Sequence, residues 1–451
     1  MGKGLAGVRS FQQGTLSDRR PEQAMQTSLE GIAKKAAAQP EYRFRNLAAL
    51  LDEEFLQESW RDIKKNAAYG VDKVSAADYE SNLAENIHDL VARLKRGGYH
   101  ARLVKRKYIP KGEGKVRPLG IPVIEDKLLQ LAVTRILEAI YEQDFLRCSY
   151  GYRPNIGALD AVDKLTIKLQ FGPYNFVVEA DIKSYFDTID HDWLVRMLEE
   201  RIDDRQLIRL IQKWLKAGVL DTDGQVIHPR SGTPQGGVIS PILANVYLHY
   251  ALDVWFQKVV KPSCKGEACL IRYADDFVAA FEYQEEAERF YNALGERLGK
   301  FGLELAADKT RIIPFARTQS QTSFAFLGFE FRWGKDRGGK PHLKRRTAPK
   351  KLRQSVQNFT KWCRGKRNMK LADLFRQLNA KLRGYYNYYG IYGNARSLNC
   401  FFQHVTEILF KWLNRRSQRH SFNWESFKQL LDPVFVKRKG THLMIEKERS
   451  L

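Results

Sequence analysis

Three aspartates stand where apolar, β-rich runs of the chain end or are interrupted. Asp181 follows the run Phe176–Ala180 directly, and Asp275 and Asp276 lie side by side between two further apolar runs. Adjacent acids in such surroundings are costly unless a cation compensates them. Three carboxylates that converge at strand ends provide the hard oxygen ligands that two Mg²⁺ ions need for an in-line phosphoryl displacement. For an isolated Asp-Asp pair, a hairpin turn with solvated acids is the simpler interpretation.

Local patterns predict the elements that must position these aspartates. Residues 176–180 predict a strand, and 270–281 predict a hairpin with the two acids at its tip. Residues 324–333 predict another strand, and 102–123 predict a hairpin that turns at Gly112–Gly114. A capping box at Thr27–Glu30 predicts the start of a helix that ends near Pro40. Helical spacing extends further over 47–63, 79–95, 124–141, 191–202, 285–301 and most of 350–430.

The composition excludes a largely disordered chain and a membrane-spanning one. The chain has 451 residues, of which 43% are hydrophobic, and no run of 18 apolar residues. The first forty residues lack the apolar segment of a signal peptide. Five scattered cysteines form neither a disulfide framework nor a zinc motif, so we expect reduced thiols in an intracellular protein. The formal net charge of +23 indicates a polyanionic partner, either nucleic acid or an anionic membrane surface.

Most of the positive charge lies in one segment near the C-terminus. Residues 341–440 contain 23 Lys and Arg against 4 Asp and Glu, whereas the rest of the chain has a net charge of only +4. The same segment is rich in Tyr, Phe and Trp. Aromatic rings among basic side chains suit stacking on bases and neutralisation of phosphates, which predicts nucleic-acid binding. A solvated basic face over aromatic helix cores is the alternative.

The motifs around the aspartates resemble those of bacterial group II intron-encoded reverse transcriptases and maturases. Arg272–Asp276 is similar to the Tyr-x-Asp-Asp box of reverse transcriptases, and Asp181–Asp187 is similar to their first catalytic motif. Ser231–Asn245 resembles a block of the intron enzymes, and 378–389 resembles their maturase segment. The resemblance covers about residues 25–430, and its further motifs, in the same order, are Tyr108–Pro122, Ser149–Pro154, Gly302–Leu305 with Lys309, and Phe326–Phe329.

The resemblance implies roles for individual residues in the polymerase reaction. Asp181, Asp275 and Asp276 would be catalytic and would bind two Mg²⁺ ions, with the Ile182 carbonyl as a further ligand. Basic side chains would neutralise the departing pyrophosphate, and an aromatic ring would exclude a ribose 2′-OH. The implied nucleotide-binding residues are Lys111, Arg117, Phe186, Gln235 and Lys309.

Each of these nucleotide contacts has a simpler alternative. Lys111 and Arg117 are also what an ordinary hairpin surface carries, and Lys309 is also compatible with a solvent-exposed role. Tyr185 is a second candidate beside Phe186, and either ring suits a hydrophobic core.

The resemblance also implies contacts to the nucleic acid. Arg153, Tyr273, Leu327 and Gly328 would contact primer or template. Arg153 is equally compatible with a buried structural role, and Leu327 with a plain core strand. In the basic segment, the implied RNA-binding residues are Lys381, Arg383, Tyr385, Arg415 and Arg416.

The fold implied is α+β: a right-hand polymerase, with fingers and a palm built on an antiparallel sheet, followed by an α-helical thumb or maturase domain. The expected division is an arm and helix at 1–40, an N-terminal extension with the fingers at 41–175, the palm at 176–340, the thumb or maturase domain at 341–430, and a tail at 431–451 without an endonuclease motif.

The implied function is an RNA-directed DNA polymerase that copies RNA into cDNA and binds intron RNA as a maturase for splicing and mobility. Its partners would be an RNA template, a DNA primer, dNTPs, structured intron RNA and a DNA target, without a membrane, in a ribonucleoprotein of the bacterial cytoplasm. The alternatives are a non-enzymatic RNA-binding splicing factor and a domesticated reverse transcriptase in defence or repair. Ala274 and the aromatic Phe186 disfavour an RNA-directed RNA polymerase.

Overall fold

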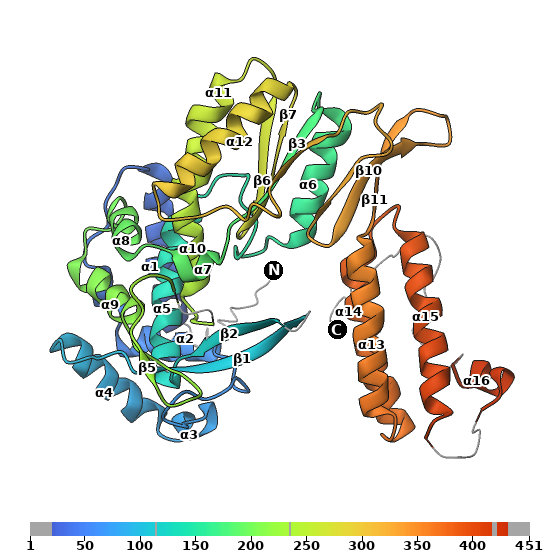
Figure 1. Cartoon of the computed structure of the whole chain (residues 1–451). Coiled ribbons are helices and arrows are strands. Elements are labelled where there is room, and N and C mark those ends of the chain that lie inside the picture. Colours follow the sequence, from blue (N-terminus) through green and yellow to red (C-terminus); the bar gives the residue numbers. More distant parts are fainter. Residues whose placement is uncertain (1–19, 113–114, 234–235, 417–421, 432–451) are drawn as a thin grey trace, which may run out of the picture. The chain divides into compact units, whose positions relative to one another are not determined.

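A computed structural model describes residues 20–112, 115–233, 236–416 and 422–431 (Figure 1). The chain forms two compact units, and it passes between them several times. The first unit contains the residues up to 154 together with 183–255 and 296–304. The second contains 155–182, 256–295 and the residues from 305 onward.

Helix α5 (Ile124–Tyr141) is the centre of the first unit. It is buried around most of its circumference, as expected for an apolar helix inside a core. Helices α1 (Arg20–Ala38), α2 (Glu53–Arg61) and α10 (Ser240–Leu248) pack against it. The unit is completed by the helical segments η1 (Leu47–Leu50), α3 (Ala76–Glu80), α4 (Leu83–Lys95), α7 (Tyr185–Thr188), α8 (His191–Glu199), α9 (Arg205–Leu215) and the π-helical η2 (His249–Asp253).

The sheet of the first unit is built on a long hairpin. Strands β1 (Val104–Gly112) and β2 (Lys115–Ile121) pair antiparallel, which confirms the predicted hairpin. Of the predicted turn, Glu113 and Gly114 lie outside the described residues. Strand β4 (Val219–Leu220) runs parallel to β1, and β5 (Val226–Ile227) pairs with β4.

The second unit carries a four-stranded antiparallel sheet, called here the aspartate sheet. Its order is β6 (Ala268–Tyr273), β7 (Asp276–Phe281), β3 (Phe176–Asp181) and β8 (Arg311–Pro314). Helix α6 (Ala158–Phe171) packs on β6. The rings of Phe256, Phe281 and Phe290 join η3 (Phe256–Val260), β7 and helix α12 (Gln284–Gly299). A short helix, α11 (Lys261–Ser263), precedes β6.

Among its described residues, the second unit continues with three further strands and four helices. Strands β9 (Ser323–Phe326), β10 (Phe329–Lys335) and β11 (Pro341–Thr347) form an antiparallel meander. The helices form a helical module, in which α13 (Pro349–Lys366) and α15 (Ala395–Leu413) lie side by side (Figure 1). Leu378, Leu382, Val405 and Leu409 are among the buried residues of its core. The helices of this module are α13 (Pro349–Lys366), α14 (Leu371–Tyr389), α15 (Ala395–Leu413) and α16 (Trp424–Leu431).

The structure confirms the α+β class, the aspartate hairpin and the mostly helical character of the described residues within 350–430, and it corrects three element boundaries. The run 324–333 is not one strand but two, because the chain turns at Leu327–Gly328. The predicted helix 47–63 is a 3₁₀ turn followed by α2, which starts anew where the Asp52 side chain accepts from Phe55 N at 2.9 Å. The predicted helix 79–95 is divided into α3 and α4.

One further expectation also needs correction. The first helix begins at Arg20, seven residues before the capping box that was expected to open it. The basic segment from residue 341 starts with strand β11, and its helical part begins at Pro349, in agreement with the helical pattern predicted for most of 350–430. All five cysteines are free thiols. Within the described ranges, no helix is long and apolar enough to cross a bilayer.

Candidate active site

Asp181 and Asp276 lie opposite each other at one end of the aspartate sheet. Asp181 is the last residue of β3, Asp276 is the first residue of β7, and the two are direct partners in the antiparallel register. Directly opposed residues on such strands have Cβ atoms about 5 Å apart, so both carboxylates can reach one cation. Asp275 occupies the turn between β6 and β7, next to this pair. The sheet therefore brings the three predicted aspartates together.

The turn that carries Asp275 has an unusual backbone. Ala274 has a φ of +56°, in the left-handed region that L-residues seldom occupy. Arg272 is fully buried, and its Nη1 donates to the carbonyl of Ala274 at 3.0 Å. This hydrogen bond links the turn to strand β6, which contains Arg272. Arg272 belongs to the predicted motif, but its role could not be predicted, because a buried arginine and a surface arginine look alike in sequence.

Several negatively charged side chains surround Asp276, which is itself largely shielded from solvent. Burial, and after it the charges of Asp181, Asp275 and Glu179, raise the pKa of Asp276 to about 7, although the Leu327 backbone N–H donates to Asp276 and opposes the shift. A carboxylate that is so difficult to ionise alone is stabilised by a cation.

One cation, a lysine side chain, is already at the site. Nζ of Lys309 forms an ion pair with Oδ2 of Asp181, and this contact raises the pKa of Lys309. Glu179, two residues before Asp181, pairs with Nη2 of Arg311 at 2.9 Å. Lys309 thus lies against the predicted metal ligand.

The carboxylates fit a metal that is shared with a substrate. No three His, Cys, Asp or Glu side chains in the described part of the chain form a ready metal cage. Mg²⁺ seldom needs one, since it usually binds one or two carboxylates together with water and substrate phosphates. The Asp181–Asp276 pair provides such a partial site. Ile182 is buried and bridges to Leu305, which fixes the backbone beside Asp181.

The turn between β9 and β10 also reaches this site. Leu327 and Gly328 have φ of +49° and +82°, and they join two paired strands as a two-residue hairpin turn. The Leu327 N–H that donates to Asp276 comes from this turn. Tyr273, the last residue of β6, is the register partner of Asp276 on the other side of β7. Tyr273 and Leu327 therefore adjoin Asp276 through the backbone, and Gly328 follows Leu327 in the turn.

The fourth predicted primer or template residue, Arg153, belongs to the first unit and has its side chain fully engaged there. Its Nε donates to Glu142 at 2.9 Å, and its Nη1 donates to the carbonyl of Ser149 at 2.9 Å. The side chain is 10% exposed. These contacts match the structural alternative for Arg153.

The motifs of the first unit meet around Phe186. Its ring is half-buried and contacts Tyr152 edge-on at 6.2 Å. The neighbouring Tyr185 is buried, and its hydroxyl donates to Ala244 at 2.5 Å, so Tyr185 is the core residue of the two. Thr233 N donates to the Phe186 carbonyl at 2.7 Å. A Cβ at Gly232 would lie 2.8 Å from that same oxygen, so only glycine fits there.

The predicted nucleotide-binding residues of the first unit differ in how far the structure describes them. Gln235 lies outside the described residues, as does the side chain of Lys111. Arg117 is exposed on β2, opposite Ile109.

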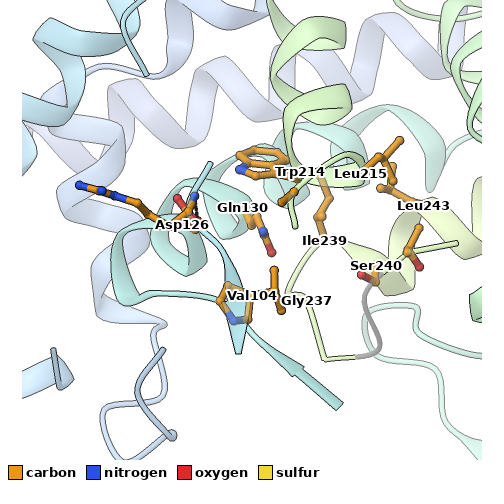
Figure 2. A pocket seen from close by; sticks show the side chains of 13 residues that line it. Val104, Asp126, Gln130, Trp214, Leu215, Gly237, Ile239, Ser240 and Leu243 are labelled. Atoms are coloured by element: carbon orange, nitrogen blue, oxygen red, sulfur yellow. Dashed lines mark hydrogen bonds between the residues drawn. The ribbon is translucent and has the colours of Figure 1, made fainter. Parts of the chain in front are cut away.

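Buried polar side chains support the backbone at Val238 and the region around α5. Figure 2 shows a pocket lined by Asp126 and Gln130 of α5, Trp214 of α9 and the backbone after Gly237. The Gln130 Oε1 accepts from Val238 N at 3.0 Å. Asp126 accepts from the Tyr99 hydroxyl at 2.6 Å, and burial raises the pKa of Asp126 to about 6. These residues were not predicted from the sequence, since polar side chains on an apolar helix form no recognisable motif.

The predicted RNA-binding residues of the helical module divide into two groups. Lys381, Arg383 and Arg415 are exposed. Tyr385 stacks on Phe401 with ring centroids 3.7 Å apart, and Arg416 donates to the carbonyls of Arg367 and Met369. The second group therefore helps to hold the module together.

Comparisons with known proteins give concordant matches. Residues 109–331 match the family described as reverse transcriptase (RNA-dependent DNA polymerase), and 350–430 match the group II intron, maturase-specific domain. Protein YkfC of Escherichia coli is 34% identical over 334 residues, which cover 66% of this chain and 85% of YkfC.

Two further similarities extend over a comparable part of the chain. The group II intron-encoded protein LtrA of Lactococcus lactis is 31% identical over 404 residues, which cover 70% of this chain and 65% of LtrA. A solved structure of telomerase from Candida albicans is similar with a TM-score of 0.44 and 14% identity. This match covers 79% of the present chain and 65% of the telomerase chain.

Proposed function

The chain belongs to the family of group II intron reverse transcriptases and maturases, and from this premise we propose that it copies RNA into DNA at the Asp181–Asp276 pair. It carries an RNA-directed DNA polymerase domain, which depends on a divalent metal, and a maturase domain at 350–430. The observation that supports the proposed site best is the direct opposition of two carboxylates beside a third, in a place where burial favours a bound cation.

We propose that Asp181, Asp275 and Asp276, with the Ile182 carbonyl, would hold two Mg²⁺ ions. When bound, such ions supply Lewis acidity for the primer 3′-oxygen and for the leaving pyrophosphate. The protein's own contribution is to fix the carboxylates: the β3–β7 register aligns two of them, and Arg272 and the Leu327 N–H hold the turn and Asp276 in place.

Lys309 is the proposed link between the metal site and the nucleotide. Its ion pair neutralises Asp181 while no other cation is there. A cation at the site would compete for the same carboxylate, so the ammonium group would become available to the phosphates of an incoming dNTP. Lys111 and Arg117 would bind the triphosphate, Gln235 would lie near the templating pair, and Phe186 would exclude a 2′-OH.

For the nucleic acid, we propose that Tyr273, Leu327 and Gly328 support the primer end. Arg153 would act indirectly, by holding the loop at Ser149. The exposed Lys381, Arg383 and Arg415 would contact structured intron RNA, while Tyr385 and Arg416 would stabilise the module. We propose that the chain acts in a ribonucleoprotein with intron RNA and binds a DNA target. We also propose that its domains are an arm, fingers, a palm, a thumb or maturase domain and a tail, with boundaries at residues 40, 175, 340 and 430.

Primer extension on an RNA template with Mg²⁺ and dNTPs tests this proposal. The wild-type chain is expected to synthesise DNA, and the double variant Asp275→Ala/Asp276→Ala is expected to synthesise none while it retains RNA binding at low salt. The rival function is that of a splicing factor without polymerase activity. Tight RNA binding by a wild-type chain that extends no primer would establish that rival.

A further inference from the structure

The backbone of Leu327 links the helical module to the aspartate site. Tyr388, near the end of α14, donates its hydroxyl proton to the Leu327 carbonyl at 2.8 Å. The N–H of the same residue donates to Asp276. In a two-residue hairpin turn, the N–H and C=O of the first turn residue have no partner in the ladder and need one elsewhere. Here, one of these groups is bound to the helical module and the other to the predicted metal ligand.

The turn needs this support because its conformation is unfavourable. Leu327 has a φ of +49°, and a bulky residue stays in the left-handed region only where its surroundings hold it. Gly328 follows with a φ of +82°, and a Cβ there would lie 2.9 Å from the Tyr389 hydroxyl oxygen. The two tyrosines of α14 therefore pack directly on the turn.

The end of α14 is itself firmly anchored. The Phe329 ring stacks on Tyr388 with centroids 5.7 Å apart and an interplanar angle of 24°. Asn394, fully buried, accepts from Thr347 N at 2.9 Å and donates to the Tyr389 carbonyl at 2.8 Å, which joins the helix end to β11. Ala348 N donates to the Gly328 carbonyl at 2.9 Å. Burial raises the pKa of Tyr388 to about 12, so its hydroxyl group stays protonated and can donate near neutral pH.

We propose that Tyr388 is a positioning residue for Asp276: its hydroxyl fixes the Leu327 backbone, and the Leu327 N–H in turn fixes the carboxylate for metal binding. The maturase helix α14 is thereby a structural part of the polymerase site. This inference rests on the proposed role of Asp276 and adds a residue that the motif comparison did not assign.

The test is Tyr388→Phe, which keeps the stacking ring and removes only the hydroxyl. Its matched control is Tyr392→Phe, since Tyr392 is 79% exposed. The first readout is Mn²⁺ affinity of the full chain without nucleotide or nucleic acid, followed by electron paramagnetic resonance. The second is the Mg²⁺ concentration at half-maximal kcat in primer extension. The third is RNA affinity at fixed salt.

Tyr388→Phe is expected to weaken Mn²⁺ binding and to raise the half-maximal Mg²⁺ concentration, each by about threefold to tenfold, the effect of one lost neutral hydrogen bond. RNA affinity and the KM for primer–template should remain at the wild-type level, and Tyr392→Phe should change nothing. Replacing Tyr388 with 4-aminophenylalanine, which restores a donor at the same position, should recover metal affinity.

Unchanged Mn²⁺ affinity and Mg²⁺ dependence in a folded Tyr388→Phe would overturn the inference while leaving the polymerase proposal intact. An equal loss with no recovery by 4-aminophenylalanine would show that the hydroxyl acts only through packing, which also overturns it. A wild-type chain that makes no DNA would instead contradict the proposed function.

Discussion

Asp181 and Asp276 face each other across two antiparallel strands, as the last residue of β3 and the first residue of β7. The relationship depends on register, since a slip of one residue would turn one of the two carboxylates to the other face of the sheet. Paired apolar residues, such as Val178 with Ala279 and Ala180 with Phe277, fix that register. The buried interior of the sheet thus positions the acids at its end.

Lys309→Met should affect metal and nucleotide binding in opposite directions. Loss of the ammonium group leaves Asp181 without its ion pair, so Mn²⁺ alone should bind more tightly. The KM for dNTP should rise by about tenfold, because a phosphate contact is lost. Mn²⁺ titration and single-nucleotide incorporation measure the two effects. Lys300→Met, on an exposed residue of the same segment, is the control. Weaker metal binding in Lys309→Met would contradict the competition that we describe.

Arg272→Met should disable the chemistry without affecting RNA binding. The variant removes the donor to the Ala274 carbonyl, so the turn that carries Asp275 loses its anchor. Displacement of a catalytic group by about 1 Å costs on the order of a hundredfold in rate, and we expect kcat to fall by about that factor. Arg317→Met serves as the control, since this exposed arginine also donates to backbone carbonyls, those of Gln170 and Gly172. A kcat within about twofold of wild type would exclude the anchoring role.

Asp126 should make the stability of the chain pH-dependent. Burial raises its pKa from 3.8 to about 6, so the folded state favours the protonated acid. The stabilisation from this group is complete below pH 3.8 and disappears as the pH rises through about 6. Full ionisation then costs about 3 kcal/mol relative to the acid form. In melting experiments between pH 5 and pH 8, Asp126→Asn should show less loss of stability than wild type. Asp62→Asn, exposed, should follow wild type; identical slopes for all three would contradict the assignment.

Substitution of the exposed basic residues of the helical module should affect RNA binding, whereas substitution of Arg416, which is hydrogen-bonded within the module, should affect stability. Lys381→Ala, Arg383→Ala and Arg415→Ala should each weaken RNA binding, and each lost phosphate contact should reduce the salt slope of binding by about 1. Arg416→Ala should instead lower the melting temperature, because two carbonyls lose their donor. Filter binding at several salt concentrations and thermal melts distinguish the two groups. A salt slope that none of the three exposed substitutions changes would place the RNA contact elsewhere.

The sequence predicted the local elements well wherever one strong pattern decided them. The α5 helix was predicted with its actual bounds because its apolar residues recur without interruption, and the aspartate hairpin because two apolar runs flank a polar tip. The turn at Leu327–Gly328 escaped prediction, since a leucine with positive φ gives no turn signal. Long-range contacts escaped it for a different reason. The Lys309–Asp181 pair, the Arg272 anchor and the Tyr388–Leu327 bond are set by tertiary packing, which no local spacing encodes.

The most direct test of the account uses Asp181→Asn and Asp276→Asn, which keep the shape of each side chain and remove its charge. The measurement is the rate of single-nucleotide addition to a DNA primer on an RNA template, as a function of Mg²⁺, beside RNA affinity and the melting temperature of each variant. We predict a loss of about a thousandfold in rate for both variants, the scale of a removed electrostatic contact to the reacting groups, with RNA affinity unchanged. Addition within about threefold of the wild-type rate by either folded variant would contradict the assignment of the site to this carboxylate pair.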